Sequence, residues 1–251
     1  LQNLQGSTGG RYNKDGLDLG NIIGGTRNIN PLEYLESEAS IYTKKLHIIQ
    51  DSGGPGKFRG GCGLLWEFEV TTHEVKAAFR GQSKYRFEPF GWKGGKAGTL
   101  GKIILNPGTQ KEKKLSGVSI FDLFNGDVVR METMGGGGYG DPLDRQPTRV
   151  LHDVQQGYVS TDSAERDYGV ILDGDKVDDA RTKKLRSILN RRLGPSQDID
   201  RGIKRKEIDK FWGNRHRSIV KQFLLTFPPS LRHMQRVKIF RELAEISKKG
   251  Q

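Results

Sequence analysis

The chain has 251 residues, a formal net charge of +12 and a hydrophobic fraction of 33%. This length can bury the core of one or two domains, and the longest apolar runs, such as residues 103–105, are far too short to cross a membrane. A single cysteine, Cys62, excludes an internal disulfide framework and a multi-thiolate zinc site. No signal sequence is recognised at the start, so a cytoplasmic location is expected.

Charge and glycine are distributed unevenly along the chain. Residues 181–251 hold 20 Lys and Arg against 6 Asp and Glu, a net charge of +14, whereas the remainder carries −2. Of the 34 glycines, 27 lie in residues 1–140. The sequence therefore predicts a near-neutral, glycine-rich body and a basic extension, and any argument for nucleic-acid binding rests on the extension alone.

The first 140 residues predict mainly β structure, after an opening stretch that is typical of a loop. β-Branched and aromatic residues predict a strand over 41–49, and alternation predicts another over 64–75. The buried face of that second strand is expected to consist of Leu64, Trp66, Phe68 and Val70. Further strands are predicted within 77–95, 102–115 and 118–133, with turns between them.

Helices are predicted after Gly140. One spans 147–156 and a second begins at Ser160 or Thr161 and ends before Gly169. A third begins near Asp178 and ends at Gly194, and Ser230 is expected to cap the last helical segment. The fold class predicted is α+β: a glycine-rich β body (1–145), short helices (146–180) and a basic helical extension that serves as an assembly surface (181–251).

Three glycine-rich strings stand out: DSGGPGKFRGG (51–61), GWKGGKAGTLGK (91–102) and GGGGYGDP (135–142). Glycine runs occur where a backbone approaches something closely, so the last string is either an anion-binding loop or a tight crossing under another segment. Arg59 could meet a carboxylate or phosphate. The three loops either converge on one anionic ligand or form separate connections. The string at 135–142 is neither a Walker A loop nor a dinucleotide fingerprint.

No catalytic arrangement is visible from spacing. The five histidines lack the spacing of a metal site, so no metal ligand is predicted. Cys62 lies among glycines with no histidine beside it and is expected to be an inert thiol.

The basic extension has two interpretations. Its Lys and Arg clusters, with Phe211 and Trp212 as stacking residues, could bind nucleic acid. Alternatively it docks on an acidic partner subunit, which the apolar residues between 219 and 227 favour.

Taken together, the strings resemble the C-terminal part of the hydantoinase B/oxoprolinase family over residues 8–172. The resemblance rests on DSGGPGKFRGG, FGWKGGKAG, FNGDVVRMETMGGGGYGDPLDR and VLHDVQQGYVSTDSAERDYGVIL, in that order. The positions that match the family's glycine loops are candidates for substrate or phosphate binding, with no catalytic role assigned to any of them: Asp51, Ser52, Gly53, Gly54, Arg59, Gly135, Gly136, Gly137, Gly138, Tyr139, Gly140 and Asp141.

The resemblance implies a function in a complex. Members work beside a hydantoinase A-type subunit that binds ATP and phosphorylates a carbonyl or enol oxygen. The B-type subunit then opens a cyclic amide or, in the ketone carboxylases, forms a C–C bond. No cofactor is expected in this chain, but ATP and a divalent metal are expected in the complex. The N-terminal part of the B-type subunit is a second expected partner, so this chain is expected to be a fragment or one of two pieces, and inactive alone. The alternatives are a nucleic-acid-binding module and a purely structural subunit of such a complex.

Overall fold

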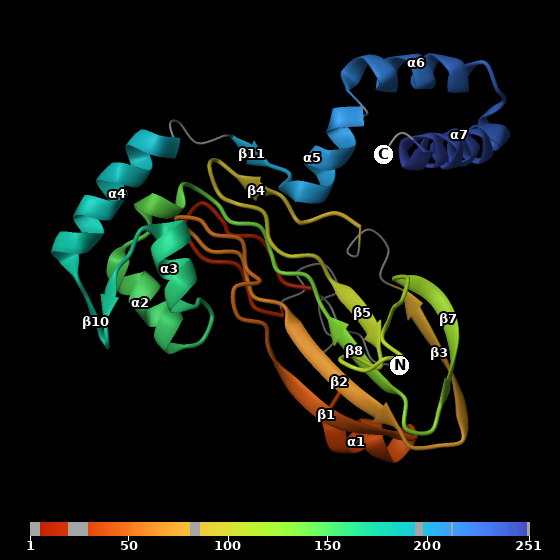
Figure 1. Ribbon diagram of the computed structural model, residues 1–251, viewed down its shortest axis with the longest axis horizontal. Helices are drawn as coiled ribbons and strands as arrows, with labels where there is room; N and C mark the ends of the chain where they lie inside the picture. The colour runs from red at the N-terminus through yellow and green to blue at the C-terminus, as the bar shows by residue number, and fades with distance from the viewer. Residues whose placement is uncertain (1–5, 20–29, 81–85, 194–197, 212, 250–251) are drawn as a thin grey trace. The chain divides into compact units, whose positions relative to one another are not determined.

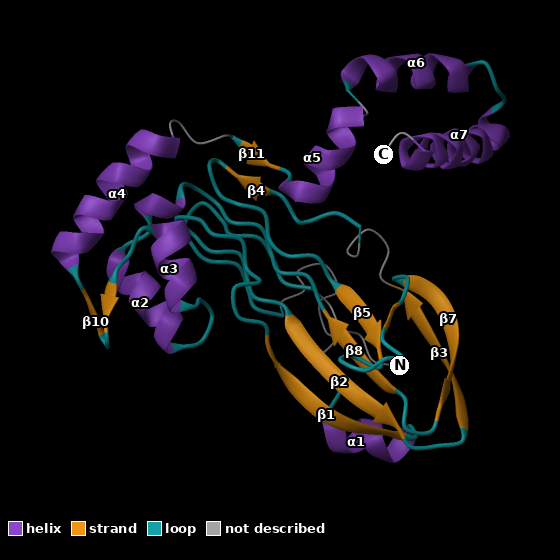
Figure 2. Ribbon diagram, in the orientation of Figure 1, coloured by secondary structure: helices purple, strands orange, loops and turns teal. Residues whose placement is uncertain are grey.

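A computed structural model of the chain describes residues 6–19, 30–80, 86–193, 198–211 and 213–249. It confirms the α+β class, and the chain divides into two compact units, residues 1–204 and 205–251. Figures 1 and 2 show the order of the elements and their type. The predicted helix end at Gly194 lies outside the described residues, as do the side chains of Phe211 and Trp212.

The first unit is built on an antiparallel five-stranded sheet of strand order β1-β2-β8-β5-β6. The strands are β1 (Ile41–Ile48), β2 (Leu64–Val70), β5 (Lys102–Leu105), β6 (Lys113–Lys114) and β8 (Val128–Glu132). The predicted alternation in β2 is confirmed, because Leu64, Trp66, Phe68 and Val70 are all buried. The one buried charge on the opposite face, Glu67, accepts a hydrogen bond from Arg130 Nε at 2.7 Å.

Two further elements complete the core beside this sheet. Strands β3 (Glu74–Arg80) and β7 (Val118–Phe124) form a separate antiparallel pair, and Phe79 and Leu123 from this pair join the core of β2. Helix α1 (Leu32–Glu38), which the sequence analysis did not predict, adds its buried Leu35 to the same core.

A helical layer follows the last strand of the sheet, as predicted. It contains the short 3₁₀ helix η2 (Pro142–Asp144), α2 (Pro147–Gln155), α3 (Thr161–Tyr168), strands β9 (Leu172–Asp173) and β10 (Lys176–Val177), and α4 (Asp179–Leu193). The predicted caps of α3 are confirmed: Ser160 Oγ accepts a hydrogen bond from Ser163 N–H, and Gly169 has a left-handed φ of 62°. Helix α4, which was assigned to the extension, contacts this layer through Arg186, whose Nη2 donates to Arg145 O at 2.7 Å.

Extended segments run side by side between the sheet and the helical layer of the first unit (Figure 2). They come from residues 6–19, 51–63, 86–101 and 133–140, which are far apart in the sequence but joined by backbone hydrogen bonds. We call these four segments the glycine bundle. The bundle segment 86–101 contains the short strand β4 (Gly91–Trp92), which pairs with β11 (Ile199–Asp200).

The second unit consists of helices. Helix α5 (Gly202–Phe211) crosses the boundary between the units, and α6 (Asn214–Leu225) and α7 (Pro229–Lys249) follow it. Helix α7 begins at Pro229, so Ser230 lies in its first turn instead of capping it. No side chain described between residues 205 and 242 is buried. Within the described part of the chain, no helix has the length and apolarity needed to span a membrane.

Candidate functional site

The glycine run at 135–140 is the central segment of the glycine bundle. Gly54 N–H donates to Gly136 O at 2.7 Å, and Gly136 N–H in turn donates to Gly61 O at 2.9 Å. On another side, Gly138 N–H donates to Lys96 O at 2.9 Å. The three glycine-rich strings singled out in the sequence therefore do converge, and they converge on one another.

Close approach of backbones explains why these positions are glycine. A Cβ atom on Gly135 would lie 1.8 Å from Ser52 O, and one on Gly137 would lie 1.9 Å from Phe90 O. Real Cβ atoms do not approach so closely, so a side chain at either position forces the segments apart. The tight-crossing alternative accounts for the run. The amides of Gly136, Gly138, Tyr139 and Gly140 all donate to backbone carbonyls, and anion binding by this loop stays a prediction.

The other candidate residues of the glycine loops hold turns in place. Asp51 has a φ of 60°, and its Oδ1 accepts a hydrogen bond from Ser160 N–H at 2.8 Å. Ser52 is buried, and its Oγ donates to Ile49 O and accepts from Gly63 N–H. Asp141 Oδ1 accepts from Leu143 N–H at 2.9 Å and caps the helix η2. A contact between these residues and a substrate stays a prediction.

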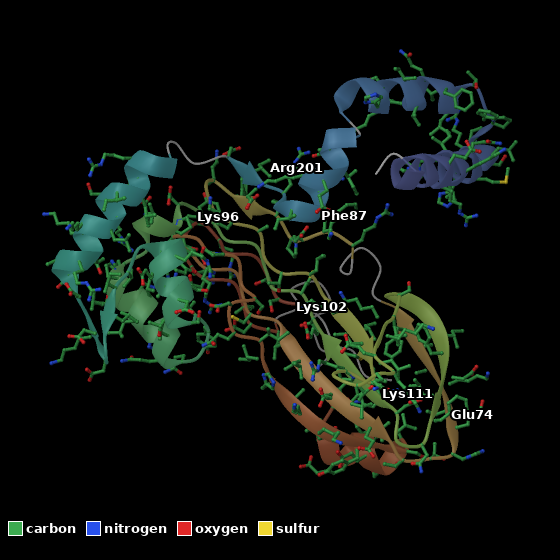
Figure 3. The ribbon with its side chains drawn as sticks, viewed as in Figure 1. Glu74, Phe87, Lys96, Lys102, Lys111 and Arg201 are labelled. Atoms are coloured by element: carbon green, nitrogen blue, oxygen red, sulfur yellow. The ribbon has the colours of Figure 1, made fainter. Side chains whose placement is uncertain are left out.

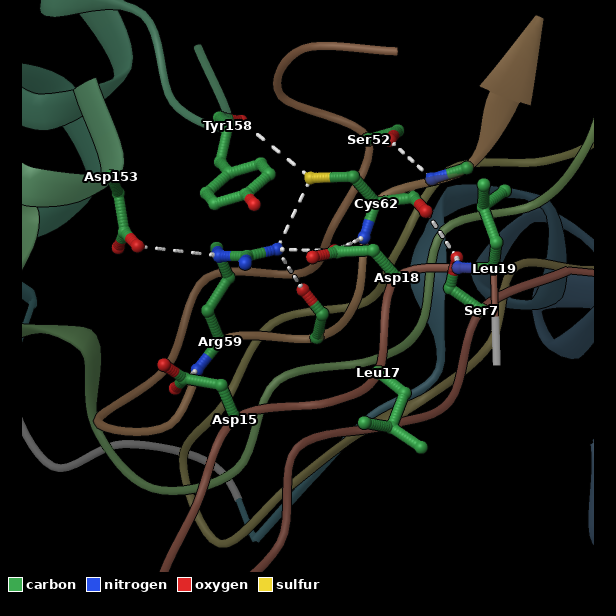
Figure 4. A network of polar contacts seen from close by, with 12 residues as sticks. Ser7, Asp15, Leu17, Asp18, Leu19, Ser52, Arg59, Cys62, Asp153 and Tyr158 are labelled. Carbon is green, nitrogen blue, oxygen red and sulfur yellow. Dashed lines mark hydrogen bonds and ion pairs between the residues drawn. The ribbon is translucent and has the colours of Figure 1, made fainter. Parts of the chain in front are cut away.

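Arg59 lies inside the fold, where only 3% of its surface is exposed (Figure 4). Its Nη1 donates to Gly60 O at 2.7 Å, to Cys62 Sγ at 3.1 Å and to Asp18 Oδ1 at 3.2 Å. Its Nε lies 3.7 Å from Asp153 Oδ1, and its guanidinium stacks 4.7 Å from the ring centroid of Tyr158. Arg59 does meet carboxylates, as its residue type predicted, but they belong to the chain itself.

A second arginine, Arg145, is even more deeply buried, with 1% of its surface exposed. It forms a bidentate pair with Asp15, with Nη1–Oδ1 at 2.7 Å and Nη2–Oδ2 at 2.9 Å. It also contacts Asp153 on α2 through Nε at 2.9 Å, and Arg149 adds a further bond to Asp15 at 2.8 Å. We call the group the buried charge cluster: Asp15, Asp18, Arg59, Cys62, Arg145, Arg149 and Asp153.

The pKa directions follow from this arrangement. Burial alone would raise the pKa of Asp15, but the hydrogen bond and the positive charge of Arg145, with Arg149, outweigh it, and the net shift is downward. The pKa of Arg145 is raised, because its hydrogen bond to Asp15 and the charges of Asp153 and Asp15 overcome the cost of burial. For Cys62, burial outweighs the favourable charge of Arg59 and raises the pKa of the thiol, which disfavours the nucleophilic thiolate.

The described residues do not fit a divalent metal. Each of the three carboxylates in the cluster already pairs with at least one arginine. Elsewhere in the described ranges, no three His, Cys, Asp or Glu side chains come together in a way that could hold an ion. Since three aspartates face three arginines, the buried charge cluster is balanced and joins the segment at 6–19 to the DSGG loop and to helix α2.

Sequence reasoning missed most of this cluster. Arg145 and Asp15 are 130 residues apart, and no spacing rule links such positions. The one available signal was the pair of aspartates in KDGLDLG (14–20), a stretch whose apolar residues follow neither a helical nor a strand period.

The lysines of the glycine-rich strings lie at the surface instead of in the cluster. Lys57 and Lys96 are exposed, and Figure 3 labels Lys96 on its loop. Lys93 is also exposed and pairs with Asp198 at 3.1 Å.

Comparisons with known proteins agree with this fold. The sequence model of the hydantoinase B/oxoprolinase family matches residues 1–142. The B-type subunit of a putative D-/L-hydantoinase from Pseudomonas sp. (strain NS671) is 30% identical over 190 residues, which cover 74% of this chain and 31% of the relative. The acetone carboxylase alpha subunit of Xanthobacter autotrophicus is 27% identical over 208 residues, covering 67% of this chain and 26% of the relative.

A solved structure matches as well. The crystal structure of ATP-dependent caprolactamase from Pseudomonas jessenii superimposes with a TM-score of 0.63 at 28% identity, covering 73% of this chain and 33% of that one. The chain therefore spans about a third of the length of the hydantoinase and caprolactamase relatives and about a quarter of the acetone carboxylase subunit.

Proposed function

Because this chain belongs to the hydantoinase B/oxoprolinase family, we propose that it is part of the B-type subunit of an ATP-dependent complex. In that complex it takes part in processing a phosphorylated carbonyl or enol intermediate. The observation that carries this proposal is the family match over residues 1–142, which covers the sheet and the whole glycine bundle. The solved relative is named as an ATP-dependent caprolactamase, which supports ATP dependence in the proposed complex.

Cyclic-amide opening is the reaction class that the relatives favour. The hydantoinase relative is matched at 30% identity over 74% of this chain, and the caprolactamase structure at 28% over 73%. Ketone carboxylation is the second candidate, because the acetone carboxylase relative is 27% identical over 208 residues. Both reactions begin from a poorly reactive carbonyl, which phosphorylation of its oxygen activates.

Within this complex we assign the chain a supporting role in the chemistry. Each carboxylate of the buried charge cluster pairs with an arginine, and the glycine-bundle amides named above already donate to backbone carbonyls, so in this proposal these groups hold backbone positions. The proposal places the nucleotide on a hydantoinase A-type subunit and the divalent metal with the N-terminal part of the B-type subunit. The complex is proposed to be cytoplasmic, and the chain alone is expected to be inactive.

The test is reconstitution. The chain is co-expressed with an A-type subunit and the N-terminal part of a B-type subunit, and the purified complex is given ATP with hydantoin, 5-oxoproline or caprolactam. We expect ATP hydrolysis coupled to formation of the ring-opened product. A parallel reaction with acetone or acetophenone and labelled bicarbonate detects carboxylation instead. Equal ATP-dependent turnover by the chain alone, or none by the assembled complex with any of these substrates, would contradict the proposal.

Substitution of Lys96, an exposed lysine of the glycine bundle, tests whether this chain contacts the substrate or has a purely structural role in the complex. Lys96→Ala in the complex should lower kcat/KM about 10- to 100-fold if this surface contacts the activated substrate, since a hydrogen bond to a charged group is lost. Lys111→Ala is the matched control, because Lys111 is also an exposed lysine but lies in the turn between β5 and β6. Unchanged activity in both variants, with assembly intact, would assign the chain a structural role only.

A further inference from the structure

Helices α6 and α7 expose large apolar side chains. On α6, Ile219 is 54% exposed and Phe223 is 49% exposed, and on α7 Met234 reaches 57%. The described side chains between residues 205 and 242 include none that is buried. Helices α6 and α7 contact each other, yet these side chains stay exposed, and in proteins most helical stability comes from packing an apolar face. The second unit therefore carries apolar surface that nothing described within it covers.

One face of α7 combines apolar and basic residues. Leu231, Met234, Lys238 and Arg241 follow one another at spacings of three, four and three residues, which places them along one side of a helix. All four are exposed. Of the half-buried residues of the same helix, Arg232, Gln235 and Ile239 lie on another side, whereas Val237 borders these four. We call Leu231, Met234, Lys238 and Arg241 the α7 face.

The charge of the unit selects among possible occupants. Residues 205–251 hold 12 Lys and Arg against 4 Asp and Glu, and Asp209 already pairs with Arg205 and Arg217. A second copy of the chain would place the same positive charge against itself, which disfavours self-association. The phosphates of a nucleic acid would pair with the Lys and Arg side chains. They would not cover Leu231 and Met234, since phosphate contacts need no apolar anchor.

We propose that the α7 face binds an acidic amphipathic helix of a partner protein. Apolar residues of that helix cover Leu231 and Met234, and its carboxylates pair with Lys238 and Arg241. This is the helix-in-groove type of recognition, in which apolar anchors supply affinity and charges supply specificity. The face lies outside the family match at 1–142, so the proposal does not rest on the ATP-dependent function and can fail or succeed independently of it.

The test uses the full chain and a synthetic peptide. The probe is a fluorescein-labelled helical peptide with leucine on one face and glutamate on the other, and its binding is followed by fluorescence anisotropy at low and at physiological salt. We expect Met234→Ser, and separately Lys238→Glu with Arg241→Glu, each to weaken binding about tenfold. The control is Lys221→Glu with Arg236→Glu, which makes the same charge change at exposed positions off the face and should weaken binding less than about threefold.

Two outcomes overturn the proposal. If the on-face and off-face charge reversals weaken binding equally, the attraction is diffuse and no face exists. If a duplex DNA of matched length binds more tightly than the peptide, displaces it, and is insensitive to Met234→Ser, the surface serves nucleic acid instead. Circular dichroism of every variant confirms that the helices are retained, so that a loss of affinity reports the face and not unfolding.

Discussion

Three aspartates and three arginines neutralise one another in the first unit, and most of their pairs join residues far apart in the sequence. Asp15 lies in a loop near the start of the chain, yet it pairs with Arg145 at 2.7 Å and with Arg149 at 2.8 Å. A charge pair that is buried contributes little by forming but costs much when only one partner is removed. The cluster therefore specifies where the segment at 6–19 must lie.

Removing the charge of Asp15 should destabilise the fold, because the segment at 6–19 is held by this aspartate. Asp15→Asn leaves Arg145 with one carboxylate instead of two, and we expect a loss of about 3 kcal/mol in the free energy of unfolding at neutral pH. Asp122→Asn is the control, because its pair with Lys76 is exposed on both sides and should be worth less than about 1 kcal/mol. Urea denaturation measures both. Equal losses in the two variants would show that the buried pairing of Asp15 carries no special weight.

The same variant has a defined pH dependence. The folded pKa of Asp15 is lowered, because the hydrogen bond and charge of Arg145 outweigh its burial. The unfolded chain therefore takes up the proton first as the pH falls. The stabilisation is present above the unfolded pKa of about 3.9 and is lost as the pH drops through the folded pKa. The difference in stability between wild type and Asp15→Asn should shrink below about pH 4, and a difference that stays constant there would contradict the assignment.

Cys62 offers a direct probe of the same region. It is the chain's single cysteine and has no exposed surface, and burial raises the pKa of its thiol. We expect its reaction with a disulfide reagent to be more than about tenfold slower in the native chain than in concentrated guanidinium chloride. The released chromophore measures the rate. Rapid reaction of the native chain would show that the cluster opens readily or that the thiolate is stabilised.

The segments of the glycine bundle pack so closely that a side chain at Gly135 or Gly137 would clash with a neighbouring backbone. Gly137→Ala should cost more than about 3 kcal/mol, since the new Cβ would lie 1.9 Å from Phe90 O. Gly213→Ala is the matched control: a Cβ there would meet nothing within 4 Å, and φ is −61°, so a change below about 1 kcal/mol is expected. Thermal unfolding compares the two, and similar midpoints would refute the packing explanation of the run.

Local rules predicted the elements well and the bundle poorly. Alternation identified β2, and the Ser160 and Gly169 caps identified both ends of α3, because each signal lies within a few residues. Helix α1 was missed because its single buried residue, Leu35, leaves no helical period to detect. The bundle has no period either, so the glycines were visible in the sequence but their partners were not. The contacts of Arg59 with Asp18 and Asp153 join residues 41 or more positions apart, beyond the reach of spacing rules.

Stability should be distributed very unevenly over the whole molecule. Both clusters of buried apolar side chains lie within residues 1–204, whereas the described side chains of 205–242 are all half-buried or exposed. Amide protection follows the free energy needed to open a region, and that free energy depends on buried contacts. Hydrogen exchange followed by mass spectrometry should therefore show amides in α6 and α7 exchanging at least about tenfold faster than those in β2 and α2.

The acidic amphipathic peptide extends this prediction to the α7 face. A ligand that binds only the folded helix stabilises it by mass action, so saturating peptide should slow exchange in α7 and leave β2 and α2 unchanged. The variant with Lys238→Glu and Arg241→Glu should lose this protection, while the variant with Lys221→Glu and Arg236→Glu should keep it. Protection of α7 equal to that of β2 without peptide would mean that the second unit is stable by itself. Its exposed apolar residues would then need no partner to cover them.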